Sequence, residues 1–367
     1  MKTLLLSTDC LHNEYRIKHN AYGGVTYYRL IAPQKAVNEL GHEWHYAGVK
    51  LQEDSKGNYN KYFGNFDAVI SKHIDNPNGA KNVKLACEKN CIPLIYDLDD
   101  DLFAIRDDNP AHESYAKGQM KRVYLATNLS FADALFVSTE PLKETYQRYM
   151  KDLFDIDMPI YVLPNYNDAE LFGNKYRMNE GKTVIGYHGS ITHDKDLAMV
   201  LPVIDSLMDK YPKLHMELIG TVRRDSINKL FDHIKNKMRF SIKAGTPAFD
   251  KFPELLMKQR WDIGIAPLIN DEFNRGKSHI KYMEYSMKAI PTVASDVYPY
   301  TKNAKEAVLC KNVNEWKQKL ENLIIDKKLR REIGQKAREH VLTECQYKDH
   351  GHEWIEAVES VIKNMSK

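Results

Sequence analysis

Short apolar runs alternate with longer segments of helical periodicity through the first half of the chain. The apolar runs have strand length and lie at 2–8, 45–49, 67–71, 93–97 and 134–139. Helical patterns lie between and after them, at 26–40, 78–90, 120–132 and 140–149. Alternation of this kind is typical of βαβ units in a parallel sheet, where ligands bind beyond the carboxyl ends of the strands.

The same alternation resumes after a polar segment at 173–181, whose flanking glycines suit a linker. Strand patterns begin at 183, 215, 240, 261 and 291, and helical patterns cover 197–210, 253–259, 277–287, 313–325, 328–340 and 348–363. We therefore expect an α/β protein with two doubly wound domains, at 1–172 and 173–345. The remaining residues, 346–367, are predicted to form a separate C-terminal helix.

Composition restricts the function only weakly. The chain has 367 residues, more than one typical domain, and 43% of them are hydrophobic. Its 53 basic and 50 acidic residues give a charge of +3, which is no reason to expect a polyanionic partner. No apolar run approaches the ~20 residues of a membrane span, so we expect a cytoplasmic protein without a transmembrane segment.

Five scattered cysteines argue against a metal site. Cys87 and Cys91 lie one helical turn apart, but no second pair of cysteines or histidines has metal-ligand spacing. We expect buried free thiols, and no metal is predicted.

The segment 277–287 offers the clearest chemistry. Its first turn carries Lys277, Ser278 and Lys281, at the end of a helix where N–H groups are unpaired and the partial charge is positive. A hydroxyl and two lysines four residues apart suit a diphosphate, and Glu284 is placed one turn further to accept hydrogen bonds from sugar hydroxyls. The alternative interpretation is a solvated basic helix end.

Residues 277–293 read Lys-Ser-x-x-Lys-x-x-Glu-Tyr-x-x-x-x-x-Pro-x-Val, which resembles the donor-binding signature of retaining sugar-nucleotide glycosyltransferases with the GT-B fold, the family-four type. The resemblance implies two Rossmann-like domains facing a cleft, with the acceptor on the first, a nucleoside diphosphate sugar on the second, and a final helix that crosses back. It implies no further cofactor and no metal. Glu284 matches the second of two donor glutamates in the family. The first falls on Gly276, so this chain departs from the pattern.

Other donor contacts follow from the same resemblance. Gly23 and Gly24 come between the first strand and a helix, and the pair is either a tight turn or the family's loop over the donor phosphates. His193, in the loop before 197–210, fits a cap neighbour or a ligand contact. The implied donor-binding residues are Gly23, Gly24, Gly189, Ser190, Arg223, Arg224, Lys277, Ser278, Lys281 and Glu284.

Polar side chains follow two strands of the first domain. His73 follows 67–71, and the strand 93–97 leads into a cluster of four acids, Asp97, Asp99, Asp100 and Asp101. Such close carboxylates repel one another unless a base, a cation or a donor hydroxyl lies among them. One interpretation is that Asp97 or Asp99 receives or orients the acceptor hydroxyl, and the other is helix N-capping by Asp99 or Asp100. The predicted catalytic residues are Lys281, Glu284, Asp97 and Asp99, and the predicted acceptor-binding residues are Arg29, His73 and Asp99.

We expect a retaining transferase that moves a hexosyl or pentosyl group to a hydroxyl of a glycan or a lipid-linked glycan, with peripheral membrane contact in the lipid-linked case. A second hypothesis is a phage-type enzyme that modifies hydroxylated bases in DNA through a groove of basic residues. These would be Arg223, Arg224, Lys235, Lys237, Arg239 and Lys243. A third is a non-catalytic nucleotide- or glycan-binding module, which the glycine at 276 favours.

Overall fold

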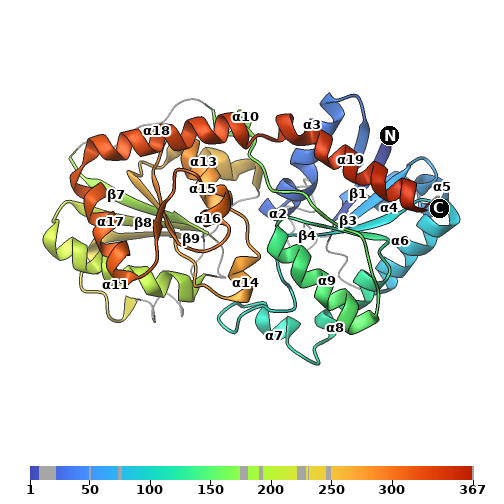
Figure 1. The fold of residues 1–367 in the computed structure, drawn as a ribbon, viewed down its shortest axis with the longest axis horizontal. Coiled ribbons are helices and arrows are strands. Elements are labelled where there is room, and N and C mark those ends of the chain that lie inside the picture. Colours follow the sequence, from blue (N-terminus) through green and yellow to red (C-terminus); the bar gives the residue numbers. More distant parts are fainter. Residues whose placement is uncertain are drawn as a thin grey trace.

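The structure is a computed structural model that describes residues 1–7, 22–48, 51–72, 77–173, 181–189, 193–220, 229, 231–244 and 249–365. Two six-stranded parallel sheets lie side by side, each flanked by helices (Figure 1). Both halves of the chain thus fold as predicted from the alternation of strands and helices.

The first sheet has the strand order β2-β1-β3-β4-β5-β6. Its strands are β1 (Lys2–Ser7), β2 (Glu43–Tyr46), β3 (Ala68–Lys72), β4 (Leu94–Leu98), β5 (Ala134–Val137) and β6 (Ile160–Val162). The helices include α3 (Ala32–Glu39), α6 (Pro77–Lys89), α8 (Met120–Ser130) and α9 (Glu140–Phe154). Because β1 pairs with both β2 and β3, the strand order reverses there, which is where open parallel sheets bind ligands.

The second sheet has the order β12-β11-β10-β7-β8-β9. Its strands are β7 (Thr183–His188), β8 (Leu214–Gly220), β9 (Phe240–Ala244), β10 (Ile263–Ala266), β11 (Thr292–Ser295) and β12 (Val308–Cys310), the last of which we did not predict. The helices include α11 (Asp194–Lys210), α13 (Phe252–Lys258), α14 (Glu272–Arg275), α15 (Ile280–Ser286) and α17 (Val313–Ile325). A Cβ atom on Gly186 would lie 1.8 Å from the Trp261 ring, so glycine in β7 lets this indole pack flat on the sheet.

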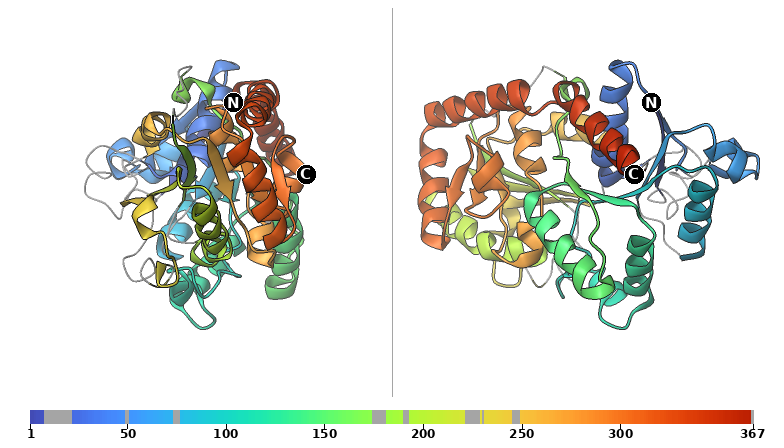
Figure 2. Two further views of the ribbon diagram at one scale, coloured as in Figure 1. Left: turned by 90° about the vertical axis from the view of Figure 1, so that its left-hand side faces the viewer. Right: turned by 45° about the vertical axis from the view of Figure 1, so that its right-hand side comes forward.

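Two long helices at the end of the chain join the domains. Helix α18 (Lys327–Glu344) lies along the second domain and α19 (Tyr347–Met365) continues over the first (Figures 1 and 2). Trp354 of α19 packs edge-on against Trp44 and Phe136, with ring centroids 6.2 Å and 6.0 Å apart. The chain crosses between the domains twice, and the crossings meet at a parallel bridge between Asn167 and Gln346.

Two helices near the site differ from the prediction. The helix expected at 277–287 is α15, which begins at Ile280, so Lys277 and Ser278 precede its first turn. The helix expected at 26–40 consists of α2 (Gly24–Thr26), a π-helical turn at Tyr27–Ile31 and α3. Such π turns are rare and are often found at functional sites.

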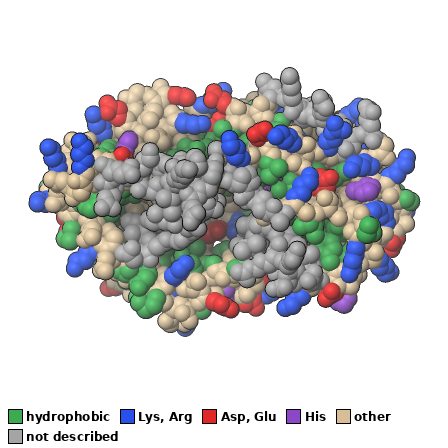
Figure 3. Space-filling view, turned by 180° about the vertical axis from the view of Figure 1, so that it is seen from behind, with side chains coloured by type: hydrophobic (Ala, Val, Ile, Leu, Met, Phe, Trp, Pro, Cys, Tyr) green, Lys and Arg blue, Asp and Glu red, His purple; other side chains and the backbone are tan. Residues whose placement is uncertain are grey.

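Surface features add little to the function. Among the described residues, no helix is long and apolar enough to cross a lipid bilayer. Cys87, Cys310 and Cys345 are buried free thiols, whereas Cys91 is exposed, which corrects the expectation for that residue. On the described part of the face opposite to Figure 1, Lys and Arg side chains are scattered over both domains with acidic side chains among them (Figure 3).

Candidate active site

A cavity of about 310 Å³ lies between the two domains and is lined by residues of both. The first domain contributes Gly24, Val25, Tyr28, Asp99 and Asp100. The second contributes His188, Gly189, His193, Phe249, Phe252, Lys277, Ser278, Ile280, Lys281 and Glu284. The structure therefore brings together seven of the predicted site residues: Gly24, Asp99, Gly189, Lys277, Ser278, Lys281 and Glu284.

Lys281 places a poorly compensated cation in this cavity. Its Nζ lies 3.5 Å from Nε2 of His193 and 5.6 Å from the centre of the Tyr187 ring. Burial, and next the nearby charge of Lys277, lower the pKa of Lys281 to about 8. A partly buried ammonium whose charged form is disfavoured is suited to an anionic ligand, which would restore that form.

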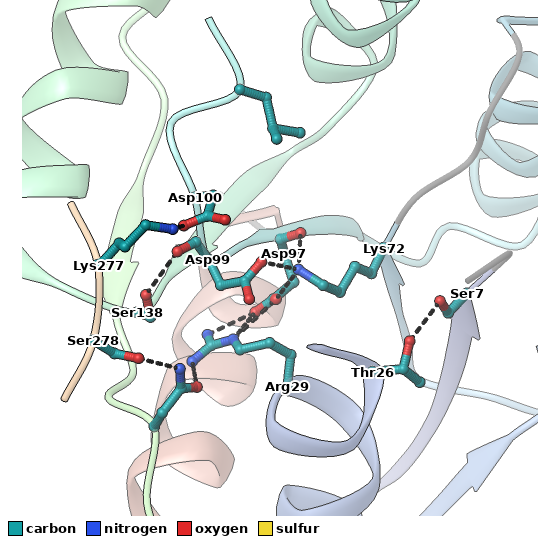
Figure 4. A network of polar contacts seen from close by, with 12 residues as sticks. Ser7, Thr26, Arg29, Lys72, Asp97, Asp99, Asp100, Ser138, Lys277 and Ser278 are labelled. Atoms are coloured by element: carbon teal, nitrogen blue, oxygen red, sulfur yellow. Dashed lines mark hydrogen bonds and ion pairs between the residues drawn. The ribbon is translucent and has the colours of Figure 1, made fainter. Parts of the chain in front are cut away.

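Lys277 and Ser278 contact the first domain (Figure 4). Nζ of Lys277 lies 3.1 Å from Oδ1 of Asp100 and 4.4 Å from the centre of the Phe273 ring. The hydroxyl of Ser278 accepts a hydrogen bond of 2.9 Å from the Asn165 amide. Both residues line the cavity as predicted, but from the turn before α15, and both join the two domains.

Glu284 is held between groups of the two domains. The Tyr28 hydroxyl, from the π turn, donates a hydrogen bond of 2.8 Å to Oε1 of Glu284. Nε2 of His188 lies 3.0 Å from Oε2, without the alignment of a hydrogen bond. The glutamate is only 2% exposed, so its carboxylate orientation is fixed before any ligand arrives.

Arg29 and Asp97 form a buried ion pair, which changes the roles predicted for them. Two guanidinium nitrogens of Arg29 contact the Asp97 carboxylate at 2.7–3.1 Å, and the third bonds to Asn165 at 3.0 Å. Both charged side chains are 0% exposed, and neither residue lines the cavity. Burial alone would lower the pKa of Arg29, but the Asp97 carboxylate raises it. In this arrangement, therefore, the two residues join the π-helical turn at Tyr27–Ile31 to β4 and are not available to an acceptor.

The other acids of the cluster each have a different partner (Figure 4). Asp99 pairs with the buried Lys72 at 2.8 Å, while Asp100 pairs with Lys277. Asp101 accepts backbone hydrogen bonds from 103 and 104, so it caps the turn in place of Asp99 or Asp100. Lys72 and Lys277 are thus the cations that the four closely spaced carboxylates were expected to need. Among the described residues, no three His, Cys, Asp or Glu side chains are grouped to hold a metal ion.

The glycines of the predicted site have distinct environments. Gly24 lines the cavity, and a Cβ atom there would lie 3.3 Å from the Phe249 ring. Gly23 precedes α2, and its carbonyl accepts a hydrogen bond from the backbone N–H of residue 27. At Gly276 a Cβ atom would lie 2.8 Å from Leu142 of the first domain, so a glutamate does not fit there without rearrangement.

Four predicted site residues lie outside the described residues: His73, Ser190, Arg223 and Arg224. Two basic residues of the predicted DNA groove already have partners in the second domain. Arg239 donates hydrogen bonds to carbonyl oxygens at the end of α11, and Lys243 donates one to Gln259.

No family model and no curated protein matches this sequence. Solved structures do match it. A glycosyltransferase from Rickettsia africae has 15% identity and a TM-score of 0.64, over 99% of both chains. HepE from Anabaena, in complex with UDP and glucose, has 14% identity and a TM-score of 0.60, over 98% of this chain and 100% of that one. TarM has 16% identity and a TM-score of 0.60, but this chain, with 82% matched, spans only 57% of TarM.

The chain has the GT-B fold. In this GT-B protein the cavity lies between the two domains, and the contacts made there by Tyr28, His193 and Asp196 were not predicted from the sequence. Tyr28 follows the glycine pair, but nothing in the sequence indicated that it reaches Glu284. His193 is both the N-cap position of α11 and a wall of the cavity, so neither interpretation of it was complete. Asp196 contacts His193, and the only sequence signal for this contact was the spacing of three residues between them.

Proposed function

We propose that this protein is a retaining glycosyltransferase that moves a sugar from a nucleoside diphosphate sugar to an acceptor hydroxyl. The observation that carries the proposal is the environment of Lys281, an ammonium with a pKa of about 8 that faces a cavity between two GT-B domains. An ammonium held in this way suits a diphosphate. Retention of configuration rests on the resemblance of 277–293 to the family signature.

The charges on the two walls of the cavity suggest how the reaction proceeds. When the bond between the anomeric carbon and the diphosphate oxygen breaks, negative charge grows on the leaving diphosphate, and Lys281 stabilises it. Glu284, fixed by Tyr28, accepts hydrogen bonds from donor hydroxyls. Asp99 lies on the wall formed by the first domain, where its carboxylate orients the acceptor hydroxyl while Lys72 balances its charge. The new bond forms between that hydroxyl oxygen and the anomeric carbon, and the hydroxyl proton passes to the leaving diphosphate oxygen.

The nucleotide and the acceptor are to be found by experiment. HepE was solved with UDP and glucose, and TarM of S. aureus with UDP and alpha-GlcNAc-glycerol, so UDP-sugars come first. The purified protein is incubated with each nucleoside diphosphate sugar and with glycan, lipid-linked or hydroxymethylated DNA acceptors. Release of nucleoside diphosphate is measured, and NMR gives the anomeric configuration of the product.

We expect release of nucleoside diphosphate with at least one donor, and its loss when Lys281 is replaced by alanine. A product with inverted anomeric configuration would refute only the proposal that the configuration is retained. Binding of a donor without transfer or hydrolysis would refute the enzyme and favour the non-catalytic module.

A further inference from the structure

Arg106 is a cation from the first domain that contacts acids of the second. It lies in the segment between β4 and α7 (His112–Tyr115). Its Nη1 is 2.9 Å from Oδ1 of Asp196 and 3.3 Å from Oδ2 of Asp271, both in the second domain. Its other nitrogens hold Asp108 of its own segment at 2.6–2.9 Å. The guanidinium is 10% exposed, so this bridge is largely sheltered from water and from salt.

Asp196 connects Arg106 to the wall of the cavity. The carboxylate is 0% exposed, and its Oδ1 also accepts hydrogen bonds from the backbone N–H of Ile269 at 2.8 Å and from Asn274 at 3.0 Å. Its Oδ2 lies 2.8 Å from Nδ1 of His193. Burial acts to raise the pKa of Asp196, but hydrogen bonds from His193 and Ile269, together with the charge of Arg106, hold it at about 2. An ionised Asp196 keeps the proton of the imidazole on Nδ1.

His193 therefore presents Nε2 as an acceptor, 3.5 Å from the ammonium of Lys281. Burial, and then the charge of Lys281, lower the pKa of His193 to about 3, so the ring is neutral at physiological pH. The charged groups acting on it are Lys277, Lys281 and Asp196. A protonated ring would repel the ammonium, whereas the neutral ring accepts its hydrogen bond.

We infer that Arg106 is a positioning residue that orients Lys281 through Asp196 and His193, so that the cation site is complete only when the two domains are in contact. This inference rests on the proposed glycosyltransferase function for its effect on turnover, but not for its effect on His193. Arg106 is not among the residues that line the cavity. Of its two contacts in the second domain, the one to Asp196 leads to His193 and Lys281, and the one to Asp271 meets the N-cap of α14.

Lys195 supplies a matched control. It also joins the domains next to Asp196, through an ion pair with Asp107, but the two side chains are 50% and 71% exposed and neither lines the cavity. Arg106→Ala is expected to lower kcat at least tenfold, because a charge-assisted hydrogen bond to a buried carboxylate is lost. Arg106→Lys, which keeps the charge, recovers part of that loss, and Lys195→Ala stays within twofold of wild type.

NMR of protein with 15N-labelled histidine tests the link from Arg106 through Asp196 to His193 without a measurement of enzyme activity. The His193 signal is assigned by its loss in His193→Gln. We expect a neutral ring protonated on Nδ1 in the wild type and in Lys195→Ala. In Arg106→Ala, and not in Lys195→Ala, the pKa of His193 rises because the charge of Asp196 is no longer balanced. Equal His193 titration in the two alanine variants would overturn the inference, as would equal kcat. If the wild type transfers no sugar, the proposed function fails, and the titration of His193 alone decides whether Arg106 acts on His193.

Discussion

Replacing Lys281 with methionine separates a binding role of this ammonium from a structural one. Methionine keeps most of the apolar stem and removes the charge. The pKa of Lys281 falls from 10.5 to about 8, which corresponds to a free-energy cost of about 3 kcal/mol for holding the side chain charged in the folded protein. Lys281→Met should therefore leave the unfolding midpoint unchanged or raise it. Under the proposed function, the same variant should lower kcat by at least a hundredfold, because the cation proposed to stabilise the leaving diphosphate is gone.

Lys288 offers a control with a similarly lowered pKa but different contacts. Burial lowers the pKa of Lys288 to about 8 as well, yet its ammonium donates hydrogen bonds to the carbonyl oxygens of Leu256 at 3.0 Å and Met257 at 3.2 Å. Lys288→Met removes these two bonds and a third to the carbonyl of Gln259, at about 1.5–3 kcal/mol for each bond from a charged donor, and this sum exceeds the cost of about 3 kcal/mol of holding the ammonium charged. It should lower the unfolding midpoint while the folded enzyme keeps its kcat.

The assay pairs thermal unfolding in the absence of nucleotide with steady-state release of nucleoside diphosphate. The reasoning fails if Lys281→Met destabilises the protein as much as Lys288→Met does. It also fails if Lys281→Met keeps the turnover of the wild type. In either case the ammonium of Lys281 would belong to the fold and not to the chemistry.

Further outcomes are expected at other positions. Tyr28→Phe should weaken UDP binding about tenfold by calorimetry, because the Glu284 carboxylate loses the hydrogen bond that the Tyr28 hydroxyl donates to it; unchanged affinity would separate Glu284 from the nucleotide. Diphosphate binding should take up protons near pH 8, and donor affinity should fall as pH rises through that value, because the anion raises the lowered pKa of Lys281. Calorimetry in buffers of different ionisation enthalpy measures this uptake, which Lys281→Met should abolish. Arg29→Met should destabilise the protein by about 3–5 kcal/mol in urea unfolding, because Asp97 loses its main partner. Stability equal to wild type would return Arg29 to the list of candidate acceptor contacts.

Much of the fold could be predicted because its strands are long apolar runs with clear ends. The central strands β3 and β4 are buried along their whole length, which is what a continuous apolar run between two helical layers indicates. The strand β12 was missed because only three residues form it and two of them are half-buried. The start of α15 was placed too early because Lys277 and Ser278 suit a first helical turn as well as the turn before it.

Residue spacing by itself indicated the site only where one segment carries it; Gly24, Asp99 and Gly189 were predicted from strand ends, turns and the family resemblance. Lys281 and Glu284 lie on the same face of one helix, so their spacing alone indicated that they act together. The partners of Glu284 and of Asp97 could not be predicted, because Tyr28 and Arg29 are neighbours in sequence and diverge only through the π turn. The Tyr28 side chain reaches the second domain, and the Arg29 side chain is buried against Asp97 in the first. Long-range pairing of this kind leaves no periodic signal in a single sequence.

The meeting of the two chain crossings at Asn167 and Gln346 has a mechanical consequence. The backbone N–H of Asn167 bonds to the carbonyl of Cys345 at 2.7 Å, and its carbonyl accepts the N–H of Tyr347 at 3.0 Å. Two segments joined by these backbone hydrogen bonds resist sliding and twisting against one another, but they can still bend together as one hinge. Any opening of the cavity between the domains would then be a swing about this line, and the contacts farthest from it would part first.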